Sequence, residues 1–457
     1  MSIAPQVAEQ ALAEAARRGH ADETVVLVTD RSTASLRWAG NSMTTNGETV
    51  SRDTTVISII RKGGNAFVGS VTSSELGSGA ISALVAASQE AARSALPARD
   101  AAPALLGTGI PADWDDPAPL TGVQAFSGIT AALRNGFGSA DTLYGFARHE
   151  LDTCYLATST GLRRRFTQPT GSVEINAKRG SASAWSGVSA PDFGAVSIDS
   201  LLAELSRRLD WAKRTVDLPA GRYETLMPPS TVADMMLCLS WAMDGRGAQE
   251  GRSALSAPGG GTRVGERLSA LDLTMYSDPA APGLECLPFV AAPTSSERIS
   301  LFDNGIDISR VDWIAGGQVN ALAYPRASAT EFGAPVTVPA DNLLMTGGTD
   351  TLNEMIARTE HGLLLTTLWY IRDVDPTVLL LTGLTRDGVY LIEDGAVTAA
   401  VNNFRFNESP LDLLRRATQA GISEMTLPRE WGDWASRAQM PSLRIPDFHM
   451  SSVSQAQ

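Results

Sequence analysis

Histidines and cysteines are the side chains of this sequence best suited to metal or nucleophilic chemistry, and they are few and scattered. The four histidines are His20, His149, His361 and His449, and no two of them share one helical turn or one short strand. A close pair of histidines is what usually starts a zinc site. The nearest approach is the segment HELDTC, where His149 and Cys154 would point to opposite faces of a strand. We therefore expect structural or exposed roles for both, and no local zinc site.

Motifs of several other enzyme classes are also missing. The sequence has no G-x-S-x-G nucleophile elbow and no C-x-x-C pair. The stretch GGGTRVGE at 259–266 lacks the Lys-Ser/Thr ending of a phosphate-binding loop, so it is predicted to be a turn. The densest acidic group is Asp113, Asp115 and Asp116, which lies in a proline-rich stretch. It is predicted to be a solvated surface.

Charge and composition limit which classes of binding partner and which cellular compartment we expect. The net charge of −13 disfavours nucleic acid and anionic membrane surfaces, which both attract basic proteins. No run approaches the roughly 18 uninterrupted apolar residues of a membrane span. The N-terminal segment has no apolar core flanked by basic residues, so no signal peptide is expected. The three separated cysteines favour a reducing compartment, and we expect a cytoplasmic protein.

The elements that would position a site form an α+β pattern. We expect an N-terminal α/β part with antiparallel strands and long helices, and a C-terminal, mainly antiparallel β domain with a buried helix. The predicted domains are an α+β module at 1–96, a connection rich in Pro, Ala and Asp at 97–122, a helix plus β-meander at 123–217, and the β-rich domain at 218–457.

Helices and turns of the N-terminal half follow from local patterns. Helices are predicted at 5–18, 78–96, 123–134 and 199–215. Small polar and glycine-containing clusters predict turns at 30–32, 46–47, 149–152, 159–161 and 169–171.

One helix of the C-terminal domain is apolar nearly all round. It is TVADMMLCLSWAMDG at 231–245, in which Val232, Met235, Met236, Leu239 and Met243 recur at helical spacing. A helix of this kind is normally buried in a core. Its cysteine, Cys238, is predicted to be a small core residue rather than a metal ligand or nucleophile.

A series of longer segments resembles a known family. YETLMPPSTVADMM, EGRSALS, SDPAAPGLECLPF, LFDNGIDISRVDWIAGGQVNALAYPRASATEFGA, LIEDGAV and NNFRF follow one another in this order over about 200 residues. Their order and spacing resemble the C-terminal half of the TldD/PmbA (TldE) family of metallopeptidases. SLRWAGNSMTTNGETV and the helix after it resemble the N-terminal half, so the resemblance covers most of the chain.

The resemblance implies a dimer that encloses a cavity. In the TldD type of subunit, a central helix with H-E-x-x-x-H and a cysteine near the C-terminus bind zinc, whereas the PmbA/TldE type lacks these ligands. The helix at 231–245 lies where the zinc helix would be expected, and it offers Met, Leu, Cys and Trp instead. The tail has no cysteine, and His449 is the less favoured candidate for a metal ligand in that region. Asp303, Arg326 and Glu393 are plausible for lining or bracing the cavity, unless each simply pairs with turn backbone.

We therefore expect a PmbA/TldE-like subunit that lacks the zinc motif and has no catalytic residue, metal ligand or cofactor of its own. Its expected partner is a TldD-type zinc-bearing homologue, or a second copy in a homodimer, and the zinc is expected in the partner. The substrate would be a peptide or a small amide. Two alternatives stay open: a hydrolase active by itself on a peptide or metabolite amide, and a non-proteolytic peptide-binding maturation factor.

Overall fold

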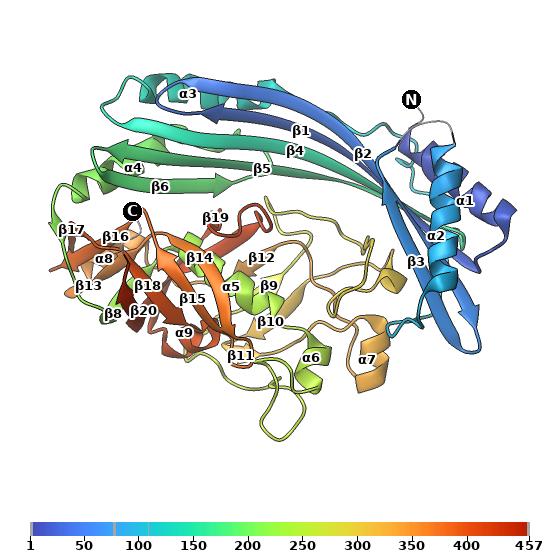
Figure 1. Cartoon of the computed structure of the whole chain (residues 1–457). Coiled ribbons are helices and arrows are strands. Elements are labelled where there is room, and N and C mark those ends of the chain that lie inside the picture. The colour runs from blue at the N-terminus through green and yellow to red at the C-terminus, as the bar shows by residue number, and fades with distance from the viewer. Residues whose placement is uncertain (1–2, 76–78, 108, 455–457) are drawn as a thin grey trace.

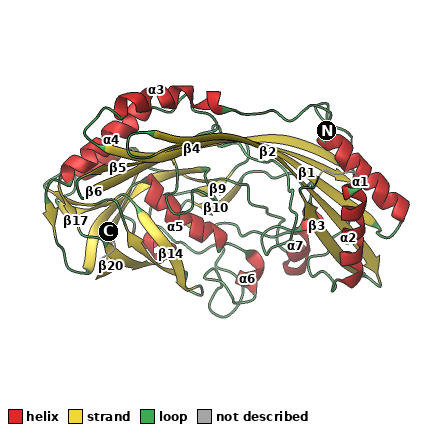
Figure 2. Ribbon diagram, turned by 45° about the horizontal axis from the view of Figure 1, so that its top comes forward, coloured by secondary structure: helices red, strands yellow, loops and turns green. Residues whose placement is uncertain are grey.

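The computed structural model describes residues 3–75, 79–107 and 109–454, and its N-terminal half is built on one long curved sheet (Figure 1). The six strands are β1 (Glu23–Trp38), β2 (Met43–Lys62), β3 (Asn65–Ser73), β4 (Thr142–Thr158), β5 (Arg163–Arg179) and β6 (Ala182–Ser189). They are ordered β3-β2-β1-β4-β5-β6, and each pair of neighbours is antiparallel. The sheet arches over the C-terminal domain (Figures 1 and 2).

Helices cover the outer side of this sheet. They are α1 (Ala4–Arg18), α2 (Ala80–Ser94), the short 3-10 helix η1 (Val123–Phe126), α3 (Ser127–Gly136) and α4 (Ile198–Trp211). Figure 2 shows α3 and α4 over the strands at one end and α1 and α2 at the other. The predicted helices at 5–18, 78–96, 123–134 and 199–215 are confirmed within a few residues, although residue 78 lies outside the described residues.

Four of the turns predicted in this half are wrong, because their residues lie inside strands. Residues 30–32 belong to β1 and residues 149–152 to β4, and the register pairs Arg31 with Asp152. The Arg31 guanidinium donates a 2.9 Å hydrogen bond from Nη2 to Oδ2 of Asp152. These polar residues stay extended because cross-strand ion pairs satisfy their charges. Residues 46–47 and 169–171 are also strand residues, of β2 and β5, whereas 159–161 is a turn as predicted.

The C-terminal half forms a second, 14-stranded sheet with short helices. Its strands are β7 (Thr215–Val216), β8 (Gly221–Met227), β9 (Met275–Ser277), β10 (Val311–Ala315), β11 (Gln318–Val319), β12 (Leu343–Met345), β13 (His361–Leu365), β14 (Leu368–Asp375), β15 (Leu380–Thr385), β16 (Val389–Glu393), β17 (Ala396–Val401), β18 (Phe404–Glu408), β19 (Gln419–Thr426) and β20 (Ala438–Val453). Its helices are α5 (Pro229–Trp241), α6 (Gly245–Gln249), η2 (Leu301–Asp303), α7 (Arg326–Phe332), α8 (Leu352–Ala357) and α9 (Pro410–Arg416).

Most strand pairs of this second sheet are antiparallel, and three are parallel: β12 with β20, β13 with β8, and β17 with β7. Together with the helix-covered first sheet, this confirms the predicted α+β fold. None of the described helices has the length and hydropathy needed to cross a membrane.

The predicted buried helix is α5, which lies in the core of the C-terminal domain. Val232, Met235, Met236 and Leu239 have no exposed surface, and α5 packs on β20, β19 and α9. Only the last turn reaches the surface, since Trp241 is 40% exposed. The helix therefore anchors the domain along most of its length and leaves its C-terminal end open to a cavity.

The two halves meet through apolar residues on the inner side of the curved sheet. Val25 and Leu27 of β1 belong to one buried cluster with Phe289 and Phe302 of the C-terminal domain. Val26 and Val28, the alternate residues of the same strand, pack instead with α1 and α2. The start of β1 is therefore buried on both faces, which fixes the sheet onto the C-terminal domain.

The burial of α5 gives a direct test of the core. Leu239→Ala should lower the free energy of unfolding by about 2–5 kcal/mol, because it removes a fully buried side chain and leaves a cavity. The matched control is Leu106→Ala, since Leu106 is 77% exposed and its loss should cost less than about 0.5 kcal/mol. Urea unfolding of both variants measures the difference. Equal losses would contradict the central role of α5.

Candidate functional site

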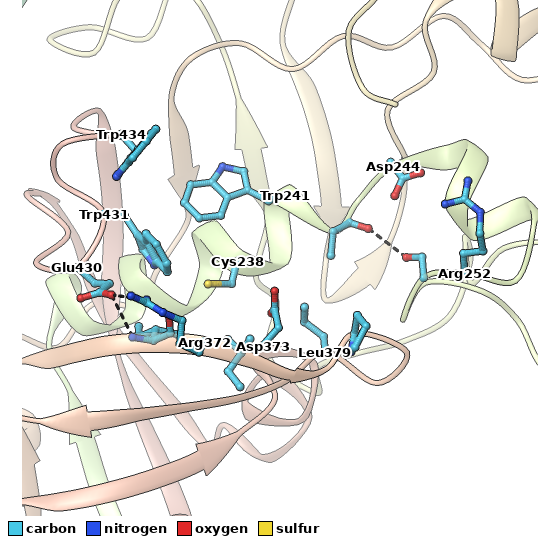
Figure 3. Close-up of a pocket in the computed structure, with 15 residues that line it drawn as sticks. Cys238, Trp241, Asp244, Arg252, Arg372, Asp373, Leu379, Glu430, Trp431 and Trp434 are labelled. Atoms are coloured by element: carbon cyan, nitrogen blue, oxygen red, sulfur yellow. Dashed lines mark hydrogen bonds and ion pairs between the residues drawn. The ribbon is translucent and has the colours of Figure 1, made fainter. Parts of the chain in front are cut away.

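A cavity of about 710 Å³ opens beside the C-terminal end of α5 (Figure 3). Four parts of the chain form its walls: the end of α5 with the turn after it, residues 252–253 after α6, strands β14 and β15 with their connection, and a segment between β19 and β20. A volume of this order suits a small ligand or a few residues of a peptide. We treat this cavity as the candidate site.

The segment between β19 and β20 supplies aromatic walls, and we call residues 428–437 the tryptophan segment. The Trp431 ring packs edge-on against Trp241 of α5, with 5.0 Å between the ring centroids. Its indole Nε1 donates a 3.0 Å hydrogen bond to the backbone carbonyl of Asp234. Trp434 also lines the cavity but is 80% exposed. Two rings are thus fixed by packing, and the third borders the opening.

Glu430 fastens the tryptophan segment to β14. The backbone of Tyr370 has a φ of 55°, and the pairing of β14 with β15 shifts register here, which is the geometry of a bulge. The Glu430 carboxylate accepts hydrogen bonds from the amides of Tyr370 (2.9 Å) and Ile371 (3.1 Å). It also pairs with the Arg372 guanidinium at 3.3 Å. The charge of Glu430 is therefore satisfied within the protein.

Asp234 holds the same segment from the side of α5. It is fully buried, and its Oδ1 accepts a 3.0 Å hydrogen bond from the amide of Glu430, whereas Oδ2 has no hydrogen-bond partner among the described atoms. Burial raises the pKa of the Asp234 carboxyl well above its usual range, and the hydrogen bonds from residues 429–431 only partly offset this. The neutral, protonated form is therefore favoured at this position.

Cys238 lies on the cavity wall with 7% of its surface exposed. Burial is the main cause that raises the pKa of its thiol above the usual value, and the nearby carboxylate of Asp373 acts in the same direction. A reactive cysteine needs the opposite environment, one that lowers the thiol pKa. Cys238 is therefore not an activated nucleophile.

The remaining charged side chains of the cavity are mostly paired, with one exception. Asp244 caps α6, because its Oδ1 accepts from the amide of Gly247, and Arg252 pairs with Glu250 at 2.6 Å. The side chain of Asp373 on β14 has no hydrogen-bond or ion-pair partner among the residues that the structure describes. Figure 3 shows its carboxylate in the cavity, below Cys238 and beside Leu379.

These side chains do not suit a zinc ion. No histidine lines the cavity, and across residues 3–75, 79–107 and 109–454 no group of three or more His, Cys, Asp or Glu is placed to hold a metal. His449 lies on β20 opposite Arg222, where its backbone amide donates to Glu408 at 2.7 Å. A zinc site needs several fixed N, S or O ligands, and one protonated thiol does not provide them.

The structure brings together two of the three residues predicted to line or brace a cavity. Asp303 is buried, its Oδ1 pairs with Nε of Arg326 at 2.7 Å, and Arg326 also donates to the carbonyl of Pro103 at 2.9 Å. This pair links the connection at 97–122 to the C-terminal domain. Glu393 lies apart on β16 and accepts a 2.6 Å hydrogen bond from Thr398. None of the three lines the cavity beside α5, and their contact with a substrate stays a prediction.

A second, smaller cavity of about 280 Å³ lies on the other side of the tryptophan segment, against the inner face of the curved sheet. Glu430 and Trp434 line both cavities. Arg429 lies over the Trp369 ring at 4.7 Å from its centroid and pairs with Glu174 of β5 at 3.4 Å. The tryptophan segment therefore also connects the C-terminal domain to the first sheet.

Sequence reasoning missed the tryptophan segment and the bulge of β14. The available signal was the cluster EWGDW at 430–434, because two tryptophans in a stretch without helical or strand periodicity suggest a purpose other than core packing. Asp373 and Glu430 carried no local signal, since each acquires its surroundings from distant parts of the chain.

The buried Asp234 predicts a pH dependence of stability. Its pKa is raised in the folded state, so its full contribution to stability is present below the unfolded pKa of about 3.9 and is lost as the pH rises above that value. Asp234→Asn should remove this loss, so the variant gains stability relative to the wild type as the pH rises from 4 toward 8. Urea unfolding at several pH values measures this difference, with the exposed Asp433→Asn as control. A difference that does not change with pH would show that Asp234 titrates normally.

Comparison with known proteins places this geometry in context. Residues 220–452, just over half of the chain, match the sequence model of the PmbA/TldA metallopeptidase C-terminal domain. No curated protein sequence matches the chain at a significant level.

Among solved structures, the chain is similar to TldE from Thermococcus kodakarensis, with a TM-score of 0.77 and 15% identity over 97% of this chain and 99% of that one. It is similar to a protein named as a proposed modulator of DNA gyrase from Bacteroides thetaiotaomicron, with a TM-score of 0.77 and 16% identity over 98% of each chain. A protein with the same description from Thermotoga maritima gives a TM-score of 0.73 and 14% identity over 97% of this chain and 99% of that one. At such identities the likeness shows the fold, while the sequence match covers more than half of the chain. The protein therefore belongs to the TldD/PmbA metallopeptidase family.

Proposed function

We propose that this chain is the metal-free partner subunit of a TldD/TldE-type heterodimeric metallopeptidase that acts on peptides or on an amide-bearing small molecule. The observation that carries the proposal is the cavity beside α5, the helix that the family resemblance equates with the zinc helix. It has tryptophan walls and no set of zinc ligands. A subunit of this kind would shape the substrate cavity, while the partner supplies the zinc.

Extended peptides suit the strand that borders the cavity. In the described part of the chain β14 pairs only with β15, and residues 371–373 of β14 line the cavity. Glu430 occupies the amides of Tyr370 and Ile371, which leaves the following residues of the strand edge for a ligand. Addition of a peptide to an open strand edge gives backbone hydrogen bonds that tolerate many sequences. This supports a peptide substrate without fixing its side chains.

The two alternative functions make different demands on the cavity. A hydrolase active by itself needs an assembled nucleophile and base, but Cys238 holds its proton and no histidine lines the cavity. A non-proteolytic maturation factor needs only peptide binding, which the tryptophan walls and strand edge would also support. The experiments below separate these alternatives from the partner-subunit proposal.

Metal content is the first test. The full chain purified alone should carry no stoichiometric zinc, because one thiol and scattered carboxylates do not form a zinc site. Elemental analysis of the purified protein measures the content. About one zinc per chain, lost in Cys238→Ala or His449→Ala, would overturn the metal-free assignment.

Partnership is the second test. Mixed with its zinc-bearing homologue, the chain should form a stable heterodimer that buries more than roughly 2,000 Å² of surface. Peptide hydrolysis, followed by mass spectrometry, should appear in the mixture and stop when the partner's H-E-x-x-x-H is altered. Cys238→Ala in this chain should leave the hydrolysis unchanged, because the protonated thiol takes no part. Full hydrolysis by this chain alone, insensitive to a chelator, would contradict the proposal, and binding without hydrolysis would favour the maturation factor.

A further inference from the structure

We propose that the cavity beside α5 binds an alkylammonium group, which a peptide carries as its N-terminal amine or as a lysine side chain. The group would lie between the tryptophan rings and the carboxylate of Asp373. The inference deepens the proposed function and rests on it for the peptide that carries the amine.

The charges that line the cavity favour a cationic ligand. The cavity is lined by three carboxylates and two guanidinium groups. Arg372 pairs with Glu430 at 3.3 Å, and Arg252 with Glu250, a residue outside the lining, at 2.6 Å. Glu430 also binds two backbone amides, as described above. Neither Asp373, which is exposed to solvent, nor Asp244, which caps α6, has an ion-pair partner among the described residues, so the cavity can accept an added cation at Asp373.

The aromatic wall of the cavity also suits a cation. An ammonium ion is attracted to the face of a tryptophan ring, and this attraction grows when water is excluded. Figure 3 shows Trp241, Trp431 and Trp434 on one side of the cavity and Asp373 on the other. A cation between them would contact aromatic faces and a carboxylate at once. A neutral ligand would gain binding energy from contact with the rings only. An anionic ligand would in addition be repelled by the carboxylate of Asp373.

The floor of the cavity is apolar. Ile371 and Leu381 are 1% exposed and Leu379 is 5% exposed, and all three line the cavity. Such a surface suits the methylene chain of an amine, whose charged end would remain free to reach Asp373. The shape of the site therefore favours an alkylammonium over a small inorganic cation.

The rim of the cavity offers contacts for the rest of a peptide. Tyr370, Val374 and Val378 lie next to lining residues along β14 and the turn after it, and they are 54–55% exposed. Trp434 adds a fourth exposed apolar surface. A peptide whose amine enters the cavity could thus pack its neighbouring residues on this rim.

Calorimetric titration of the full chain with short synthetic peptides tests the inference. The first peptide is blocked at both ends and has one central lysine, the second is identical but has norleucine there, and the third has norleucine and a free N-terminus. We expect the blocked norleucine peptide to bind at least about tenfold more weakly than the better of the two amine peptides. The comparison of the lysine and free N-terminus peptides identifies which source of the amine the cavity prefers.

Variants assign the binding to this cavity. Asp373→Asn should weaken the amine peptide by at least about tenfold, which corresponds to ~1.4 kcal/mol, and should leave the norleucine peptide unchanged. Trp434→Ala should weaken the amine peptide severalfold. Asp433→Asn is the matched control, because it makes the same charge change one residue from Trp434 but outside this cavity, and it should change affinity less than about twofold.

The inference is overturned if no peptide binds, if norleucine binds as well as lysine and the free amine, or if Asp373→Asn binds the amine like the wild type. These results concern the chain alone. They are distinguishable from failure of the proposed function, which would appear as a missing heterodimer or as hydrolysis without a partner while amine binding persists.

Discussion

The carboxylate of Glu430, bound to the amides of Tyr370 and Ile371, is the contact on which the candidate site depends. It joins the tryptophan segment to the bulge of β14, while the amide of the same residue binds the buried Asp234 of α5. Next to it, Arg429 reaches Glu174 of the first sheet. One short segment thereby connects the central helix, an open strand and the curved sheet, and the two cavities lie on either side of it.

The interior around this contact favours binding over proton transfer. Burial raises the pKa values of Asp234 and Cys238, which favours their protonated forms, and the carboxylate of Glu430 is occupied by amides and Arg372. General bases and nucleophiles need groups whose protonation changes easily near neutral pH. The cavity offers rigid aromatic rings and one free carboxylate instead, which is consistent with the non-catalytic role that we propose within a metallopeptidase family.

The first sheet shows how ion pairs can override local turn preferences. Residues 30–32 and 149–152 have the composition of turns, yet they face one another in the middle of long strands. Arg31 binds Asp152, and Thr33 donates to Glu150 at 3.0 Å. The strands continue because Arg31 and Thr33 find their partners on the neighbouring strand. The resulting length lets the sheet arch over the C-terminal domain.

The sequence by itself determined the helices, the α+β class, the burial of α5 and the family, because these follow from local periodicity and from the order of short motifs. Only the tertiary structure decided the length of the strands, the Asp303–Arg326 pair and the cavity. Its contacts join residues far apart in the chain, such as Glu430 and Asp234, which are separated by 196 positions. The local sequence does not indicate such partners, because the burial and the pKa of these side chains depend on the residues that lie next to them in the folded chain.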